Sequence, residues 1–410
     1  MFLLYEVLTI IVIIFSPFIF FFRLIFGKED PKRILEKFCI YSKNYKNTKT
    51  VWFHGASVGE ILSIIPIIQI LEKNKKIKKI LLTSSTKSSA LIFRKYRFKK
   101  TTHVYYPIDE NNLTKRFINY WQPKLAIFID SEIWPNMFKN LSKKEVPIIL
   151  INGRITSKSY YRWIKFKKFS REIFSKITLT LPQNTESFKY LKKLGVRRVK
   201  IAGNLKYFGQ SKNFQDKSIK QKFKNRLIFC AASTHHNEEL FIGKLHKELK
   251  TKYKNLLTII IPRHINRADS IINDLEGINL NLVTRSSGQK ISKSTDIYIA
   301  DTYGEASKFY KLSKITFLGG SLINHGGQNP LEAARMGNYI LHGPNIQNFK
   351  EVYKMLSKFN ISSKARNTNI MKKIIDRKIG YKRSSKIIKK LNSIGNGILK
   401  KNLIEINRFL

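Results

Sequence analysis

The chain has 410 residues, of which 77 are Lys or Arg and 27 are Asp or Glu, so its formal net charge is +50. Its hydrophobic share of 43% excludes intrinsic disorder, and its length exceeds what one hydrophobic core usually organises, which predicts two domains. Cys39 and Cys230 are too few for a disulfide framework or a cysteine zinc site. The positive charge fits nucleic acid, an anionic membrane or phosphorylated substrates.

Residues 1–26 are almost entirely apolar, and about 20 apolar residues suffice to cross a bilayer core. No basic residue precedes the run and no small-residue cleavage pattern follows it, so a cleaved signal peptide is not indicated. Arg23 and Lys28 at its end predict that the rest of the chain lies in the cytoplasm. We predict a membrane anchor, with a buried core helix as the alternative. Glu6 and Pro17 leave open whether the anchor spans the bilayer or lies in its interface.

After this segment, short apolar runs typical of buried parallel strands alternate with longer amphipathic stretches. The expected strands are residues 50–53, 80–83, 125–129, 147–151, 177–181, 227–231, 257–261, 296–299, 315–318 and 339–341. A lysine-rich stretch at 211–226 interrupts the rhythm. We therefore predict two Rossmann-like α/β domains facing across a cleft, over 27–210 and 211–385. A C-terminal helix over 386–410 is expected to pack back on the first domain.

The first polar motif at a strand end is HGASVGE, residues 54–60. Its small residues permit a tight turn, and Glu60 begins the next helix. A carboxylate there is placed to accept a proton from an attacking hydroxyl, whereas the alternative is that Glu60 only complements the helix dipole. The motif is neither GxGxxG nor Walker A, so neither a dinucleotide site nor a P-loop is indicated.

Asp130 and Glu132 follow the expected strand at 125–129. Paired carboxylates can divide acid and base roles, as they do in glycosidases. The alternative is that one of them caps the following helix, which is a common use of acidic residues.

In the second half, Arg263 follows a strand and offers a planar fork that matches phosphate oxygens. His235 and Glu238 resemble metal ligands, but we interpret them as solvated residues at a helix start. Gly-rich turns at 319–321 and 326–327 precede a helix and are suited to presenting amides to an anion. The alternative is a helix cap with Asn329 as N-cap, Pro330 in the first turn and Glu332 at the third position.

Together these motifs resemble the 3-deoxy-D-manno-octulosonic acid (Kdo) transferase family, in the same order and at similar spacing up to about residue 349. The matching motifs are VWFHGASVGE (51–60), SEIWPN (131–136), PRH (262–264), DTYGE (301–305) and GGQNPLE (326–332). The resemblance implies a glycosyltransferase-B-type fold. It also implies an inverting transfer of Kdo from a CMP-Kdo donor to the lipid A precursor, lipid IVA, in lipopolysaccharide biosynthesis.

The resemblance also assigns site residues. Glu60 matches the general base, and Asp130 and Lys206 match positions that stabilise the transition state, although the family usually has Glu where this chain has Asp130. The positions that match CMP-binding residues are Pro262, Arg263, Gly304, Glu305, Ala306, Asn329, Pro330, Leu331 and Glu332. The family often has Leu in place of Ala306.

No cofactor is expected, and no metal either, since no D-x-D motif lies at a strand end. Lysines are spread over nearly all helices without a recognisable module, which argues against nucleic acid as a partner. The expected location is the cytoplasmic side of the inner membrane, on an anionic lipid surface. The alternative function is that of another membrane-associated nucleotide-sugar glycosyltransferase with a different lipid-linked acceptor.

Overall fold

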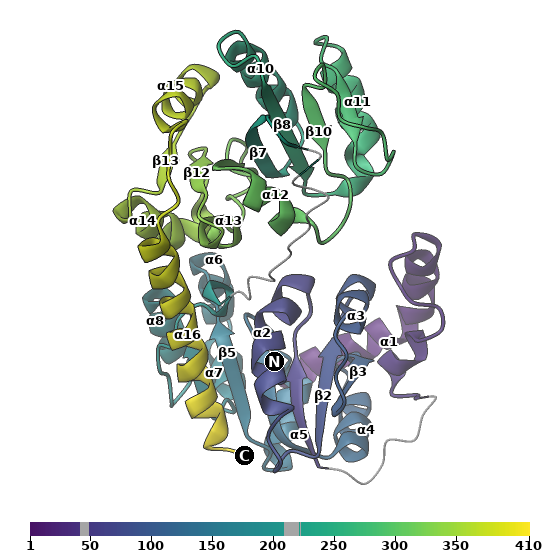
Figure 1. Cartoon of the computed structure of the whole chain (residues 1–410). Helices are drawn as coiled ribbons and strands as arrows, with labels where there is room; N and C mark the ends of the chain where they lie inside the picture. The colour runs from purple at the N-terminus through teal and green to yellow at the C-terminus, as the bar shows by residue number, and fades with distance from the viewer. Residues whose placement is uncertain (42–48, 209–220, 222) are drawn as a thin grey trace. The chain divides into compact units, whose positions relative to one another are not determined.

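The computed structural model describes residues 1–41, 49–208, 221 and 223–410. Most of the lysine-rich stretch at 211–226 therefore lies outside the described residues. The chain divides into two compact units, and each is built around a parallel sheet flanked by helices (Figure 1). The first unit comprises Met1–Phe208 and Ile394–Leu410, and the second comprises Gly209–Ser393. The predicted fold class, two parallel α/β units with an N-terminal apolar helix, is confirmed.

The first unit holds a six-stranded sheet in the order β3-β2-β1-β4-β5-β6, with every neighbouring pair parallel. Its strands are β1 (Thr50–His54), β2 (Lys79–Ser84), β3 (Thr101–Tyr105), β4 (Pro123–Ile129), β5 (Ile148–Gly153) and β6 (Leu179–Pro182). The strand order reverses between β1 and β4. In such sheets ligands bind beyond the carboxyl ends of the strands at this reversal.

Alternate residues of β1 enter different hydrophobic cores, as the pleat of a strand requires. Trp52 packs into one core, while Val51 and Phe53 pack into the other. The helices of this unit are α1 (Phe2–Ile25), η1 (Ile34–Phe38), α2 (Val58–Leu71), α3 (Lys87–Arg94), α4 (Asn111–Trp121), α5 (Pro135–Lys143), α6 (Ser157–Ile164), α7 (Lys167–Phe174), α8 (Thr185–Leu194) and η2 (Leu205–Tyr207). The last helix, α16 (Ser385–Asn407), begins in the second unit and adds Leu399 and Ile406 to a core of the first.

The second unit holds a seven-stranded sheet in the order β13-β12-β11-β7-β8-β10-β9, again parallel. Its strands are β7 (Leu227–Thr234), β8 (Leu256–Pro262), β9 (Leu282–Thr284), β10 (Ile297–Ile299), β11 (Ile315–Leu318), β12 (Tyr339–His342) and β13 (Ser362–Lys364). Its helices are α10 (Glu238–Lys250), η3 (Ile265–Arg267), α11 (Ala268–Glu276), α12 (Ala306–Leu312), α13 (Leu331–Arg335), η4 (Gln347–Phe349), α14 (Lys350–Lys358) and α15 (Thr368–Lys378). Here the order reverses between β11 and β7.

The N-terminal helix α1 is long and apolar enough to cross a membrane, and in the described part of the chain it alone meets that criterion. Only Thr9 and Ser16 of this helix are buried. The alternative of a buried core helix is therefore wrong, because a core helix covers its apolar side chains with protein.

Candidate functional site

Glu60 lies in the first turn of α2, directly after β1. Ser57 is the N-cap of this helix, and its hydroxyl accepts a hydrogen bond from the Glu60 N–H at 3.4 Å. The Glu60 carboxylate in turn accepts hydrogen bonds from the Ala56 N–H and the Ser57 hydroxyl, both at 2.7 Å. The arrangement is related to a capping box, but the Glu60 carboxylate accepts from the backbone N–H of Ala56 and not from that of Ser57. These hydrogen bonds stabilise the start of α2.

The environment of Glu60 also suits proton transfer. Burial raises the pKa of its carboxyl to about 7, and the negative charges of Glu132 and Asp130 add to the rise, while hydrogen bonds from Ser57 and Ala56 oppose it. A carboxylate is an effective general base when its pKa lies near the working pH. Because the charges of Glu132 and Asp130 act on Glu60, the three carboxyl groups lie near one another at the carboxyl end of the sheet.

Asp130 directly follows β4 and is paired with Lys206. Its backbone adopts a left-handed conformation, with φ at 60°, held by hydrogen bonds to Ile151 and Arg154. The Lys206 Nζ lies 3.6 Å from Asp130 Oδ2. Burial raises the pKa of Asp130, although the positive charge of Lys206 limits the rise. The structure therefore brings Asp130 and Lys206 together, 76 residues apart in number, at the same end of the sheet as Glu60.

Glu132 does not cap the following helix, because α5 begins at Pro135 with Trp134 as its N-cap and no side-chain cap. Instead its Oε2 accepts a hydrogen bond from Trp134 Nε1 at 3.0 Å and lies 3.2 Å from His54 Nε2. His54 was not assigned a role from the sequence. Its place at the end of β1 is the signal that identifies it, since it faces the same acidic group.

In the second unit, the carboxyl ends of β7 and β8 meet. The Arg263 N–H donates to the Thr234 carbonyl at 3.0 Å, and the Arg263 side chain is exposed. The Thr234 hydroxyl and His235 Nε2 are buried without a hydrogen-bond partner among the described residues. The His235 ring lies 4.4 Å, centroid to centroid, from that of His325. Polar groups with free hydrogen-bonding capacity thus lie at the end of β7, whose Thr234 is bonded to the backbone of Arg263.

The first Gly-rich turn does not present its amides to an external anion. The Glu238 carboxylate accepts hydrogen bonds from the N–H groups of Gly320 at 2.7 Å, Ser321 at 3.1 Å and Leu322 at 3.0 Å. Burial alone would raise the pKa of Glu238, but these bonds and one from His235 outweigh it, so its pKa is lowered. The protein's own carboxylate therefore fills the anion site expected there.

A glycine is required at the start of this turn. A Cβ atom on Gly319 would lie 2.4 Å from the Ser233 carbonyl oxygen, which no side chain tolerates. Across residues 1–41, 49–208, 221 and 223–410, no group of three or more His, Cys, Asp or Glu residues is arranged to hold a metal ion. Glu238 is instead the structural centre of the loop.

Glu305 is fixed by neighbouring cations rather than left open. Its carboxylate pairs with Arg285 at 3.0 Å and Lys308 at 2.9 Å, and it accepts a hydrogen bond from the Thr302 hydroxyl at 2.5 Å. Hydrogen bonding by Arg285 is the main reason why the pKa of Glu305 falls to about 2. The preceding Gly304 has φ at 85°, a conformation that favours glycine. Helix α12 begins at Ala306, with Glu305 as its N-cap residue.

The expected cap of α13 is shifted by one residue. The helix begins at Leu331, so Pro330 rather than Asn329 occupies the N-cap position. Asn329 still contributes, because its side-chain oxygen accepts a hydrogen bond from the Leu331 N–H at 3.1 Å. Glu332 lies exposed in the first turn.

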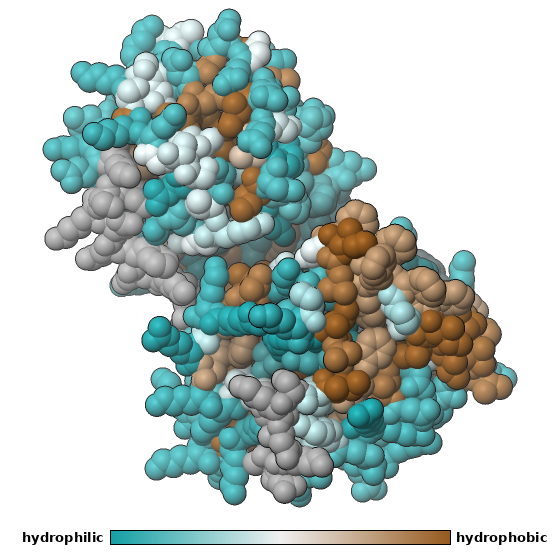
Figure 2. All heavy atoms as spheres, turned by 90° about the vertical axis from the view of Figure 1, so that its right-hand side faces the viewer, coloured by the Kyte–Doolittle hydropathy of each residue, from teal (hydrophilic) through white to brown (hydrophobic). Residues whose placement is uncertain are grey.

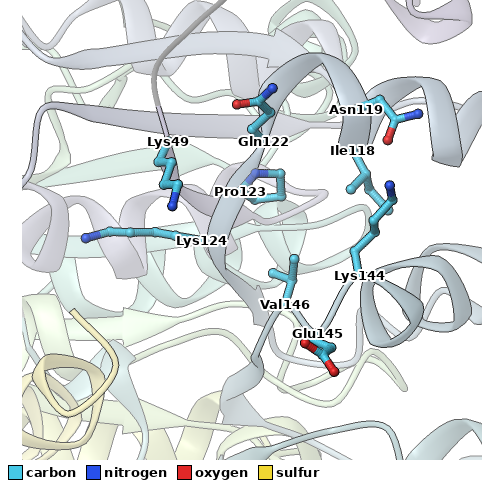
Figure 3. Close-up of a pocket in the computed structure, with 9 residues that line it drawn as sticks. All are labelled: Lys49, Ile118, Asn119, Gln122, Pro123, Lys124, Lys144, Glu145 and Val146. Carbon is cyan, nitrogen blue, oxygen red and sulfur yellow. The ribbon is translucent and has the colours of Figure 1, made fainter.

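A separate pocket of about 350 Å³ lies elsewhere in the first unit (Figure 3). Its lining includes Lys49, Pro123 and Val146, which precede or begin β1, β4 and β5. This is the amino end of the sheet, opposite to Glu60. We therefore exclude it from the candidate site.

Two solved structures have a similar fold. A glycosyltransferase from Rickettsia africae has a TM-score of 0.59 at 13% identity and covers 88% of this chain and 99% of its own. UDP-GlcNAc 2-epimerase from Neisseria meningitidis has a TM-score of 0.57 at 13% identity, with 87% and 99% covered. The two parallel α/β units and these neighbours show a glycosyltransferase-B-like fold.

Sequence comparison assigns the family. A family model described as 3-deoxy-D-manno-octulosonic-acid transferase matches residues 32–208. The 3-deoxy-D-manno-octulosonic acid transferase of Rickettsia bellii is 33% identical over 354 residues, covering 86% of this chain and 84% of the relative. That of Haemophilus influenzae is 31% identical over 361 residues, with 85% and 84% covered. The chain belongs to the Kdo transferase family of glycosyltransferases.

Proposed function

We propose that this protein transfers Kdo from CMP-Kdo to the lipid A precursor lipid IVA, with inversion at the Kdo anomeric carbon. Family membership supports the donor and the reaction class. The observation that carries the mechanism is the half-buried Glu60, whose pKa of about 7 lets it hold and release a proton at neutral pH.

In this mechanism the Glu60 carboxylate takes the proton of an acceptor hydroxyl. The hydroxyl oxygen attacks the anomeric carbon on the face opposite CMP, so a new glycosidic bond forms while the bond to the phosphate oxygen breaks. The electron pair of that bond leaves with CMP. One base is sufficient, because CMP already departs as a stable phosphate anion.

We propose that Lys206 and its partner Asp130 stabilise the charge that develops in the transition state. The Lys206 ammonium offers positive charge where negative charge develops, and Asp130 holds it in place at 3.6 Å. The shorter side chain of Asp130 replaces the usual Glu of the family, and we propose that it keeps the same role.

For the donor, we propose that Arg263 binds the CMP phosphate and that the exposed Glu332 accepts hydrogen bonds from the ribose hydroxyls. The backbone at Pro262, the turn from Gly304 to Ala306 and the segment from Asn329 to Leu331 complete the nucleotide site. We propose that Thr234 and His235, which end β7 and have buried polar atoms without partners among the described residues, belong to the same site. We infer no metal requirement, and EDTA should leave the rate unchanged.

Glu60→Gln tests the base directly. Gln keeps one acceptor oxygen for the Ala56 N–H but takes no proton at neutral pH, so we expect the fold to persist while transfer stops. We expect incubation of this variant with CMP-Kdo and tetra-acylated lipid A precursor to give no product by mass spectrometry, while CMP-Kdo still binds. Glu172→Ala, which removes an exposed carboxylate of the same unit, is the control and should keep full activity. Unchanged turnover by Glu60→Gln would refute the assignment.

We further propose that α1 attaches the protein to the cytoplasmic face of the inner membrane. The apolar character of the helix and the basic residues at its end support this location.

A further inference from the structure

Helix α1 is fixed to the first unit at its N-terminal end. The Tyr5 hydroxyl donates a hydrogen bond to the buried Asp109 carboxylate at 2.8 Å. One residue further on, Glu6 forms an ion pair with Lys139 of α5 at 2.7 Å. These polar contacts tie the first turns of the helix to the unit that carries Glu60.

The C-terminal end of α1 is fixed to the same unit. Arg23 pairs with the buried Glu29 at 2.7 Å, and Glu29 pairs with Lys37 of η1 at 2.8 Å. The η1 segment is in turn held to the sheet, because the Glu36 carboxylate accepts a hydrogen bond from the Tyr105 N–H of β3 at 2.8 Å. The end of the helix therefore cannot move away without breaking this chain of contacts.

In the middle of α1, a narrow row of side chains contacts the first unit. The Asn136 amide donates to the Thr9 hydroxyl at 3.4 Å, and Ser16 is buried. Phe20 packs on Phe38 of η1, with ring centroids 5.7 Å apart. Tyr5, Thr9, Ser16 and Phe20 recur at helical spacing, so one face of α1 rests on the unit along its length.

The remaining faces of α1 are exposed and apolar. Figure 2 shows a broad hydrophobic area on the side of the molecule where α1 lies. The exposed large apolar side chains of this helix are Leu3, Leu4, Val7, Leu8, Ile10, Ile11, Val12, Ile14, Phe15, Phe18, Ile19, Phe21, Phe22 and Ile25. Water-exposed patches of this kind mark an interaction surface.

A helix of 24 residues is about 36 Å long, enough to cross a hydrocarbon core of about 30 Å. A spanning helix, however, puts its two ends on opposite sides of the membrane. Here both ends contact one polar unit, which cannot lie on both sides. We propose that α1 lies flat in the interface of the cytoplasmic leaflet, with its apolar face among the acyl chains, and does not cross the bilayer. The inference rests on the membrane attachment proposed above.

The charge around the helix selects an anionic lipid surface. Lys28 and Lys32 are exposed beyond its C-terminal end. Lys167 and Lys168 are exposed on α7, whose Phe169 contacts Phe2 at the other end. Lysines at both ends would repel those of a second copy but attract the headgroups of phosphatidylglycerol.

Topology is the decisive test. The full chain receives a protease-cleavable epitope tag before Met1 and a second tag after Leu410, and cleavage is followed in inner-membrane vesicles of both orientations. We expect both tags to be cut in inside-out vesicles and neither in right-side-out vesicles. Cleavage of the N-terminal tag in right-side-out vesicles would show a spanning helix and overturn the proposal. The readout needs no activity, so it is independent of the proposed reaction.

The lipid surface is tested with phosphatidylglycerol and phosphatidylcholine vesicles. The purified protein should sediment with the former, and Phe15→Asp/Phe22→Asp should lower this binding at least about tenfold, because charges are costly among acyl chains. Lys192→Asp, on the exposed surface of α8, is the control for added charge and should bind like the unchanged protein. A protein that dimerises through α1 and does not bind vesicles would overturn the proposal.

Discussion

At the scale of the residue, the two carboxylate oxygens of Glu60 accept hydrogen bonds at the start of α2, and in the proposed mechanism the same carboxylate takes the acceptor's proton. Because burial raises its pKa to about 7, the ionised form required of a base is a minority below neutral pH. We expect kcat/KM to rise about tenfold per pH unit as the pH approaches 7 and to level off above it. Initial rates with CMP-Kdo across that range measure this dependence. A rate independent of pH on the acidic side would contradict the role of Glu60.

The effect of the Lys206 charge on kcat can be separated from a general effect of charge by comparison with a control lysine. Lys206→Met removes the positive charge near Asp130, and we expect kcat to fall by about 10²- to 10³-fold with little change in KM. Lys206→Arg should recover part of the loss, because the charge is kept. Lys200→Met makes the same change at a lysine that pairs with Glu405 of α16 at the surface, and it should leave kcat unaltered. Equal losses in the two variants would indicate a general effect of charge.

At the scale of the element, the carboxylate of Glu238 organises the loop from Gly319 to Leu322. Glu238→Gln leaves backbone donors poorly paired, and we expect a loss of about 1–3 kcal/mol of unfolding free energy in the second unit. Since the pKa of Glu238 is lowered in the folded protein, its stabilisation is present above the unfolded pKa and is lost as the pH falls. Thermal unfolding at neutral and acidic pH measures both effects. Glu276→Gln, on an exposed carboxylate, should change neither.

The sequence predicted the central strands of both sheets and the edge strand β6, but not β3, β9 or β13. All three lie at sheet edges. A central parallel strand is covered on both faces and reads as a continuous apolar run, which the patterns at β1, β4 and β11 display. An edge strand such as β13, with the sequence Ser-Ser-Lys, has one neighbour and needs no such run.

In the candidate site, features set by neighbouring residues could be predicted from the sequence, whereas contacts between residues far apart in the sequence could not. The place of Glu60 at the start of a helix could be predicted, because the motif HGASVGE is local in sequence and follows a strand directly. The filling of the Gly-rich loop by Glu238 could not, because Glu238 and Gly320 are 82 residues apart and meet only once the sheet has formed. The later start of α13 at Leu331 was missed because a proline fits either the N-cap or the first helical position.

At the scale of the whole molecule, the net charge of +50 and the apolar face of α1 should contribute to membrane binding by different physical means. Attraction between lysines and anionic headgroups is screened by salt, with a Debye length of about 10 Å at 0.1 M and about 3 Å at 1 M. Burial of apolar side chains is not screened. We therefore expect added salt to weaken association with phosphatidylglycerol vesicles at least about tenfold without abolishing it. CMP binding, which depends on short contacts, should stay nearly constant in the same titration. Association that does not respond to salt would mean that the lysines only solvate the helices and that α1 alone holds the protein at the membrane.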